Sequence, residues 1–171
     1  MRSKPGREVE PVELLKGLAE MTGSLDGTGR RFALVAARFN ESITSRLLVG
    51  AADALVQNGV AVDDLKVLRV PGVWELPSAC ARVLKQGGIN AVIALGCVIR
   101  GETPHFEFVA REAARGLGAL SVRAPIPIVF GVLTTDTFEQ ALDRAGPGER
   151  NKGREAALSA LEMANLFSEL R

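Results

Sequence analysis

The single histidine of the chain, His105, is the side chain best suited to carry protons near neutral pH. It opens a segment with helical periodicity, where the positive end of the helix dipole disfavours the imidazolium and favours a neutral ring. A neutral imidazole in that place suits a general acid or base. A partly exposed histidine that only caps the helix is the alternative, and residue type and position leave both interpretations open.

Phe39, Trp74 and Glu75 could bind a planar, hydroxylated molecule. The two rings offer faces for a heterocycle, although either could equally lie in the core, which we favour for Trp74. Glu75 could accept hydrogen bonds from a polyhydroxyl chain, or it could complete a cap at the start of a helix. These residue types therefore allow a heterocycle site without requiring one.

A basic, glycine-rich segment at residues 144–154 holds four cations, Arg144, Arg150, Lys152 and Arg154. Side chains and backbone amides of such a segment can bind phosphate, and solvated surface is the alternative. The chain has neither the Walker spacing nor the G-x-G-x-x-G fingerprint, so neither kind of nucleotide-binding loop has support.

The overall composition indicates one globular domain without a polyanionic partner. The chain has 171 residues, 47% of them hydrophobic and 24% charged, which is enough to build a core. Its formal net charge of +1 gives no reason to expect nucleic acid or an acidic membrane surface as a partner.

The two cysteines, Cys80 and Cys97, favour a reducing compartment, because they match no metal spacing and are too few for a disulfide framework. Cys97 does not fit a nucleophile elbow, which favours a buried structural thiol.

The longest apolar run, 89–99, is about half of what a membrane-spanning helix needs, and the first residues do not resemble a signal peptide. We therefore expect a cytoplasmic, unexported protein.

From residue 31 onward, short apolar or β-branched runs alternate with segments of helical periodicity. This pattern predicts an α/β fold with a parallel sheet covered by helices. The expected strands are 31–37, 65–70, 91–95 and 126–133, and the expected helices are 43–58, 76–86, 106–117, 137–145 and 154–170. We expect left-handed C-caps at Gly59, Gly87 and Gly118, a capping box at Asp136 and Glu139, and a buried stripe along the last helix at Ala157, Leu161 and Ala164.

Residues 1–29 form a leader that differs from the domain expected at 30–171. Leu14, Leu15, Leu18 and Met21 could make one or two amphipathic turns, whereas residues 23–29 indicate a flexible joint. We favour a dispensable tail over a functional arm.

In open α/β sheets, ligands bind beyond the carboxyl ends of the strands, where loops and helix N-termini converge. The unusual residues of this chain gather in the segments that follow the expected strands. These segments are 38–40, 71–75, 97–105 and 130–136. We therefore expect the site at this edge of the sheet.

Five ordered strings carry a resemblance to a known family. They are Ala-Ala-Arg-Phe-Asn at 36–40, Pro-Gly-Val-Trp-Glu-Leu-Pro at 71–77, Ala-Leu-Gly-Cys-Val-Ile-Arg-Gly-Glu-Thr-Pro-His-Phe at 94–106, Pro-Ile-Val-Phe-Gly-Val-Leu-Thr at 127–134, and Arg-Ala-Gly at 144–146 with Asn-Lys-Gly at 151–153. From residue 31 to the C-terminus the chain resembles the lumazine synthases. The resemblance implies a flavodoxin-like, three-layer fold with a four-stranded parallel sheet.

The activity implied by this resemblance is the penultimate step of riboflavin biosynthesis, a condensation without cofactor or metal. The substrates would be 5-amino-6-(D-ribitylamino)uracil and 3,4-dihydroxy-2-butanone 4-phosphate, with phosphate and water released. The residues implied for the pyrimidine and its ribityl chain are Phe39, Val73, Trp74, Glu75, Cys97, Val98, Ile99 and Phe130. Those implied for the sugar phosphate are Glu102, Thr103, Arg144 and Lys152, and His105 would move protons.

The resemblance also implies a homo-oligomer in which a neighbouring subunit supplies Phe130 and Arg144 to each site. The family forms pentamers, and in many members twelve pentamers build an icosahedral shell of 60 subunits. Because residues 144–152 show no evident insertion, we favour the shell over a free pentamer. Two other functions stay open, a non-catalytic flavin- or lumazine-binding module and a hydrolase that uses Cys97 and His105.

Overall fold

Four parallel strands form the central sheet of the computed structural model, which describes residues 17–170. The strands are β1 (Phe32–Ala37), β2 (Leu65–Val70), β3 (Ala91–Ile99) and β4 (Ile128–Thr135), in the spatial order β2-β1-β3-β4. Every residue of β1 is buried, as a central strand covered on both faces requires. The predicted α/β fold with a four-stranded parallel sheet is confirmed.

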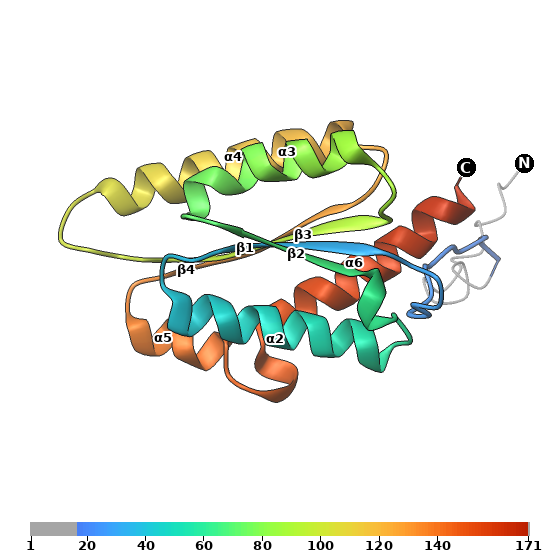
Figure 1. Cartoon of the computed structure of the whole chain (residues 1–171), viewed down its shortest axis with the longest axis horizontal. Helices are drawn as coiled ribbons and strands as arrows, with labels where there is room; N and C mark the ends of the chain where they lie inside the picture. The colour runs from blue at the N-terminus through green and yellow to red at the C-terminus, as the bar shows by residue number, and fades with distance from the viewer. Residues whose placement is uncertain (1–16, 171) are drawn as a thin grey trace, which may run out of the picture.

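Helices cover both faces of this sheet and make the molecule three layers thick. They are α2 (Glu41–Gln57), α3 (Leu76–Gln86), α4 (His105–Arg123), α5 (Phe138–Arg144) and α6 (Lys152–Glu169), with short 3-10 turns η1 (Val62–Asp64), η2 (Val73–Glu75) and η3 (Gly148–Arg150). Figure 1 shows α3 and α4 on one face and α2, α5 and α6 on the other. None of the helices within 17–170 has the length and apolarity needed to cross a bilayer.

Each face of the sheet carries its own apolar core. Leu34 and Ile93 point to the side of α2 and α6, whereas Val35 and Val92 point to the side of α3 and α4. The stripe predicted along the last helix is confirmed, because its members Ala157, Leu161 and Ala164 are buried in the first of these cores.

Strand β3 extends four residues beyond its expected end at residue 95 because its neighbour β4 keeps pairing with it. The register runs from Val92 opposite Ile128 to Ile99 opposite Thr135. The segment that follows Leu95, expected as a loop, is therefore partly strand.

Gly118 does not end a helix, contrary to our prediction. Helix α4 continues through it to Arg123, and Leu117 and Leu120 pack against the core on either side. Burying leucine side chains is worth about 1.5–3 kcal/mol each, more than the roughly 1 kcal/mol that a glycine costs inside a helix. Gly59 and Gly87 do have the positive φ expected after a helix, +93° and +67°.

The capping box predicted at Asp136 and Glu139 is also wrong. The N-cap of α5 is Thr137, one residue later, and its hydroxyl accepts a hydrogen bond from the Gln140 amide at 3.2 Å. Asp136 instead pairs with Arg100 at the end of β3.

Gly23 and Gly27, within residues 23–29, serve close packing, which differs from the flexible joint we expected. A Cβ on Gly23 would lie 1.9 Å from the carbonyl oxygen of Glu162 in α6. The Gly27 amide donates to the carbonyl of Asn58 at 2.7 Å, and Asn165 of α6 donates to the Ser24 and Asp26 carbonyls. The segment is therefore held along the domain.

The amphipathic turns expected before this segment are not helical where the structure describes them. Leu18 and Met21 are 59% and 53% exposed and lie outside any helix. Leu14 and Leu15 lie outside the described residues.

Candidate active site

A cavity of about 340 Å³ opens beyond the carboxyl ends of β1 and β3. Segments far apart in the sequence meet around it: the residues after β1, the turn after β2, the end of β3 and the first turns of α4. Its lining consists of Phe39, Gly72, Val73, Trp74, Cys97, Val98, Ile99, Gly101, Thr103, His105, Phe106 and Val109. We call it the aromatic cavity.

The rings of Phe39 and Trp74 are exposed walls of this cavity. Their exposed fractions are 71% and 58%, so the core interpretation that we favoured for Trp74 is wrong. Large aromatic side chains in a concave surface offer stacking faces to a flat ligand.

Asn40 fixes the turn that presents Phe39. It adopts a left-handed conformation with φ of +60°, and its side-chain amide donates to the Cys97 carbonyl at 2.9 Å. The Phe39 amide donates to the carbonyl of Pro71 at 3.0 Å, which ties the same turn to the loop after β2. We did not single out Asn40 from the sequence, although asparagine is enriched in left-handed positions.

Glu75 closes the turn that follows β2. Its Oε2 accepts a hydrogen bond from the Gly72 amide at 2.8 Å, so the capping role considered from sequence is present. The residue lines a neighbouring recess, together with Trp74, Ser78 and Glu112, rather than the aromatic cavity itself.

Arg100 joins three parts of the site, and sequence reasoning missed it. Its guanidinium pairs with Asp136 at 2.7 Å and with Glu107 at 3.5 Å, and lies 4.6 Å from the centre of the Phe106 ring. The hydrogen bond that Arg100 donates to the Asp136 carboxylate raises the pKa of Arg100 above its already high value. Because exposed ion pairs add little stability, the main effect is to orient the loop between β3 and α4.

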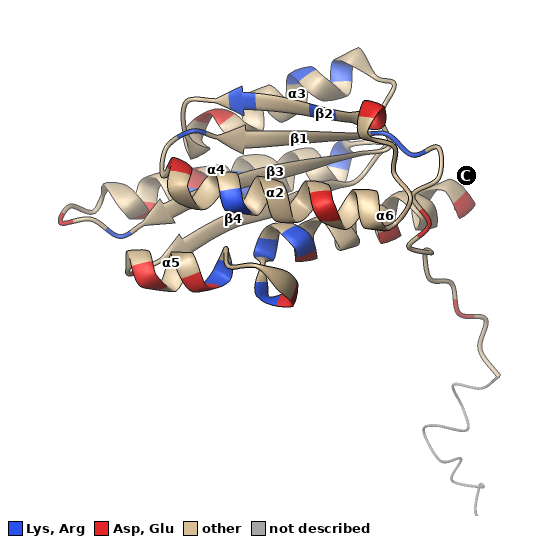
Figure 2. Cartoon of the chain, turned by 60° about the horizontal axis from the view of Figure 1, so that its bottom comes forward, with Lys and Arg blue, Asp and Glu red and all other residues tan. Residues whose placement is uncertain are grey.

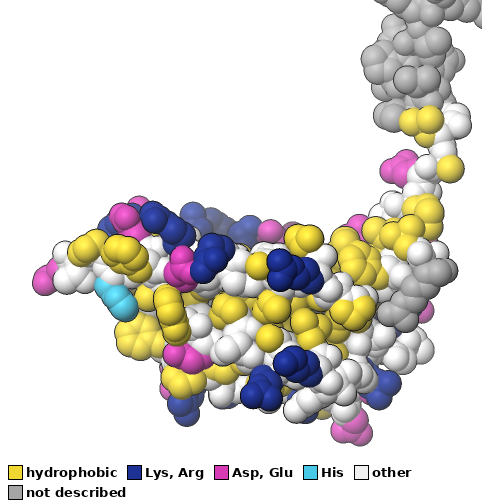
Figure 3. All heavy atoms as spheres, turned by 90° about the horizontal axis from the view of Figure 1, so that it is seen from above, with side chains coloured by type: hydrophobic (Ala, Val, Ile, Leu, Met, Phe, Trp, Pro, Cys, Tyr) yellow, Lys and Arg dark blue, Asp and Glu magenta, His cyan; other side chains and the backbone are white. Residues whose placement is uncertain are grey.

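His105 is the first residue of α4 and faces the aromatic cavity. The N-cap is Pro104 and no side chain caps this helix, so the capping alternative for His105 is wrong. Figure 3 shows the histidine (cyan) at the surface beside hydrophobic side chains. Thr103 lines the cavity as well, whereas Glu102 is exposed and outside the lining.

Phe130, Arg144 and Lys152 lie in a second hollow, also about 340 Å³, at the β4 edge of the sheet. Figure 2 shows basic residues gathered where α5 ends and α6 begins. The Arg144 guanidinium donates to the Gln140 carbonyl at 3.0 Å, and Lys152 pairs with Glu155. This cationic hollow and the aromatic cavity have no lining residue in common.

Comparison with known proteins identifies the family. Residues 29–168 match the family model described as 6,7-dimethyl-8-ribityllumazine synthase. The chain belongs to this family. A 6,7-dimethyl-8-ribityllumazine synthase of Aquifex aeolicus is 51% identical over 149 residues, which cover 87% of this chain and 97% of the relative.

Two further relatives agree. Proteins with the same name from Chlorobaculum tepidum and Desulfatibacillum aliphaticivorans are each 47% identical and cover 86% and 87% of this chain, and 96% of their own lengths. The resemblance of the five strings to the lumazine synthases is thus confirmed at the level of the family.

The two thiols of this lumazine synthase family member are buried and unpaired. Burial raises the pKa of Cys97 to about 11 and that of Cys80 to about 12, above the ordinary value of 9.0. A thiol that stays protonated near neutral pH is a poor nucleophile, which argues against the hydrolase alternative. Within residues 17–170, no three His, Cys, Asp or Glu side chains are placed to hold a metal ion.

Proposed function

We propose that this chain forms 6,7-dimethyl-8-ribityllumazine from 5-amino-6-(D-ribitylamino)uracil and 3,4-dihydroxy-2-butanone 4-phosphate at sites shared by two subunits. The observation that carries this proposal is the division of chemistry within one chain. An aromatic cavity with His105 lies at the carboxyl end of the sheet, and a cationic hollow with Phe130 lies at the β4 edge. The proposed reaction needs both sets of groups, His105 and the aromatic rings of the cavity and the cations of the hollow.

The pyrimidine belongs in the aromatic cavity. Phe39 and Trp74 supply ring faces, and the end of β3 supplies backbone groups. Pairing between β1 and β3 stops at Ala36 and Leu95, while β3 continues to Ile99 along β4. Backbone groups that face the β1 side beyond Leu95 therefore have no strand to pair with. The Cys97 carbonyl accepts from the Asn40 amide, and the other groups can hold the edge of a heterocycle, because backbone amides and carbonyls need hydrogen-bonding partners.

The ribityl chain extends from the pyrimidine toward Glu75 and Val73. The hydrogen bond from the Gly72 amide fixes one Glu75 carboxylate oxygen, and a carboxylate accepts several hydrogen bonds at once. Glu75 can therefore complete its turn and receive ribityl hydroxyls together.

The sugar phosphate lies between the two half-sites. Thr103, with Glu102 beside it, comes from the aromatic side, and Arg144 and Lys152 of the neighbouring subunit supply the positive charge. Contacts between a guanidinium or ammonium and a phosphate are charge-assisted and strong.

The chemistry needs groups that bind, orient and move protons. An aryl amine attacks the ketone and water leaves, phosphate is then eliminated, and the second amine closes the ring with loss of another water. His105 carries protons between the attacking amine, the departing water and the carbon that gives up its proton as phosphate leaves. Holding two reactive molecules in register supplies much of the acceleration.

Incubating the purified protein with both substrates tests this function directly. We expect the lumazine chromophore to appear with one phosphate released per product. A non-catalytic lumazine- or flavin-binding module would bind the product without producing either signal, and that result would overturn the proposal.

We further propose that residues 30–171 form the catalytic domain, that the protein works in the cytoplasm, and that its subunits form pentamers. The family match that begins at residue 29 supports the boundary, and the two unpaired thiols support a reducing compartment. A pentamer is a closed ring of heterologous contacts, as a site shared head to tail requires.

A further inference from the structure

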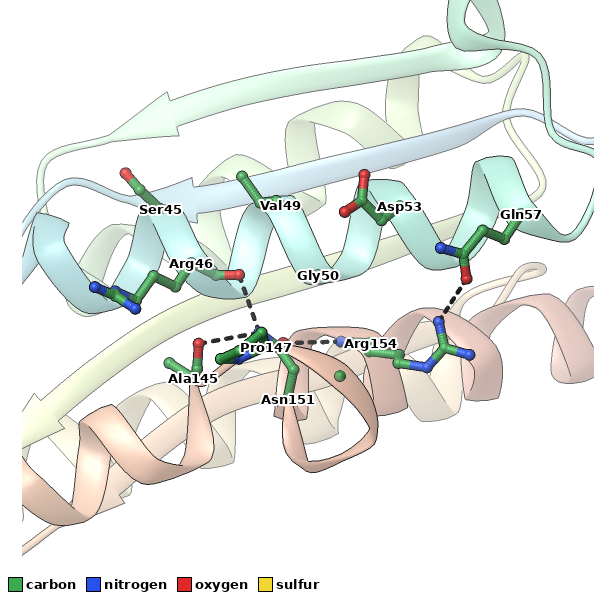
Figure 4. A pocket seen from close by; sticks show the side chains of 11 residues that line it. Ser45, Arg46, Val49, Gly50, Asp53, Gln57, Ala145, Pro147, Asn151 and Arg154 are labelled. Atoms are coloured by element: carbon green, nitrogen blue, oxygen red, sulfur yellow. Dashed lines mark hydrogen bonds between the residues drawn. The ribbon is translucent and has the colours of Figure 1, made fainter.

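Asn151 is a buried polar side chain at the junction of α5 and α6. It is 3% exposed. Its side-chain nitrogen lies within hydrogen-bonding distance of three carbonyls, those of Ala145 at 3.1 Å, Gly146 at 3.0 Å and Arg46 at 3.1 Å, so two of them share one of its two N–H groups. The first two carbonyls belong to the loop that follows α5, and the third belongs to α2. Figure 4 shows the contacts to Ala145 and Arg46.

The side-chain oxygen of Asn151 faces the other way and caps α6. It accepts hydrogen bonds from the Gly153 amide at 2.9 Å and from the Arg154 amide at 3.1 Å. One side chain therefore joins α2, the loop after α5 and the first turn of α6. An N-cap alone needs only the oxygen, so the contacts of the side-chain nitrogen with three carbonyls call for another explanation.

Asn151 and the start of α6 pack tightly against α2. A Cβ on Gly50 of α2 would lie 2.3 Å from the Asn151 Oδ1 atom, and a Cβ on Gly153 would lie 2.0 Å from the Leu47 carbonyl oxygen. Two glycines thus allow α2 and α6 to approach closely enough for Asn151 to reach the backbone of both.

The two cations of the cationic hollow flank this junction. Arg144 is the last residue of α5, directly before Ala145, and Lys152 directly follows Asn151. Both side chains are exposed, and their own partners, Gln140 and Glu155, lie on their own helices. Neither contact fixes one cation relative to the other. The bonds of Asn151 do so, because they close the loop that separates the two residues.

We propose that Asn151 is a positioning residue for phosphate binding: by closing the loop between α5 and α6, it sets the spacing of Arg144 and Lys152. This role rests on the proposed binding of the sugar phosphate by those two residues. Asn151 touches no substrate. It acts through backbone geometry alone.

Two variants of Asn151 separate its capping of α6 from its closure of the loop between α5 and α6. Asn151→Ser keeps a capping oxygen but is too short to reach the three carbonyls, and Asn151→Asp keeps the shape and the cap but cannot donate. Both variants should raise the KM of the sugar phosphate by at least about tenfold, because small misplacements of binding groups are costly. The KM of the pyrimidine and kcat at saturation should change less than about threefold, and inorganic phosphate should inhibit more weakly.

Asn165→Ala is the matched control. Asn165 lies on the same helix, is 5% exposed, and its side-chain nitrogen also has three acceptors, the Ser24 carbonyl and hydroxyl and the Asp26 carbonyl, far from the cationic hollow. Its loss should lower the unfolding temperature without a selective rise in the KM of the sugar phosphate. Gly50→Ala displaces Asn151 from the α2 side and should reproduce the selective rise even where the Asn151 variants fold poorly.

The positioning role is overturned if the Asn151 variants and Gly50→Ala leave the KM of the sugar phosphate unchanged. It is also overturned if they raise the KM values of the sugar phosphate and the pyrimidine equally, as a general loss of stability would. Arg144→Ala tells this failure from a failure of the proposed site. Where Arg144→Ala raises that KM and the Asn151 variants do not, only the positioning role is overturned. Where Arg144→Ala has no effect, the phosphate half-site is misplaced and both are overturned.

Discussion

Trp74 and Phe39 remain exposed, whereas Phe32 in the central strand β1 is buried completely. Full burial of such a ring contributes about 1.5–3 kcal/mol, which the two exposed rings largely forgo. Residue type alone therefore favoured the core for Trp74. Its position after a parallel strand, at the edge where ligands bind, was the better guide.

At His105, removal of the imidazole should slow the reaction without stopping it. We expect His105→Ala to lower turnover at saturating substrates by about ten- to a thousandfold, since general acid–base assistance is typically worth about 10²–10⁴ and the positioning of the substrates survives. Steady-state rates of lumazine formation measure the effect. Unchanged turnover would remove His105 from the mechanism.

Arg144→Ala and Glu75→Gln should affect different substrates. Loss of the guanidinium should raise the KM of the sugar phosphate by about tenfold or more, because a charge-assisted contact is lost. Glutamine at position 75 keeps an oxygen for the Gly72 amide, so the turn survives and mainly the KM of the ribityl-pyrimidine should rise, by a few-fold. Each variant is the control for the other, and equal losses for both substrates would contradict the assignment.

Among the secondary-structure elements, the sequence predicts best those whose limits depend on their own residues. Strand β2 and helix α3 have the expected bounds, because turn residues flank them on both sides. The end of β3 was missed because pairing with β4, a long-range contact, extends it to Ile99. The end of α4 was missed because packing of Leu117 and Leu120 outweighs the cost of Gly118.

The packing of α6 on α2 depends on the absence of a side chain at position 153. Gly153→Ala should lower the free energy of unfolding by about 2–3 kcal/mol, since overpacking against backbone cannot be relieved by a rotamer change. Gly118→Ala is the matched control, because nothing lies within 4 Å of its added Cβ, and it should stabilise α4 by up to about 1 kcal/mol. Urea titrations of both variants measure the difference, and equal effects would show that the contact with Leu47 is relieved elsewhere.

The buried thiols of α3 and β3 make the folded state sensitive to alkali. In the unfolded chain a thiol ionises near pH 9.0, whereas burial raises the pKa of Cys97 to about 11 and that of Cys80 to about 12. The folded state therefore holds its protons more tightly. Stability is complete below about pH 9 and falls by up to about 1.4 kcal/mol per pH unit for each thiol as the pH rises toward the folded pKa values.

Replacement of both Cys80 and Cys97 by alanine should flatten this alkaline loss. The free energies of unfolding of the two proteins, compared at pH 8 and pH 10.5, measure it. The variant is less stable at pH 8 because it loses packing, so the slope with pH is the informative quantity. Parallel slopes would show that the thiols do not control alkaline stability.

For the molecule as a whole, parallel strands made the site's edge predictable, while the separation of the aromatic cavity from the cationic hollow was not predictable from residue types. Four strands that end at one edge bring Phe39, Trp74 and His105 together from distant segments. The same geometry places Phe130 and Arg144 around the outer edge of β4, where no loop within residues 17–170 returns them to the first group. Only the resemblance to a family of oligomers supplied the neighbouring subunit.

The proposed closed ring with shared sites makes a quantitative prediction. If every site takes His105 from one subunit and Arg144 from the next, two variants that are each impaired should complement each other. In rings assembled at random from equal amounts of His105→Ala and Arg144→Ala subunits, about a quarter of the sites combine an intact His105 with an intact Arg144, because each condition holds at about half of the positions. Coexpression of both variants and assay of the mixed rings measure this activity.

Rings of the two single variants, purified separately and then mixed without subunit exchange, are the control and should show no gain. Light scattering on the same samples should report a pentamer or the 60-subunit shell that the uninterrupted segment at 144–152 favours. A free pentamer that complements would refute the shell and keep the shared site. A fully active monomer, or mixed rings without any gain, would refute the shared site itself, because then one chain must bring its aromatic cavity and its cationic hollow to the same substrate.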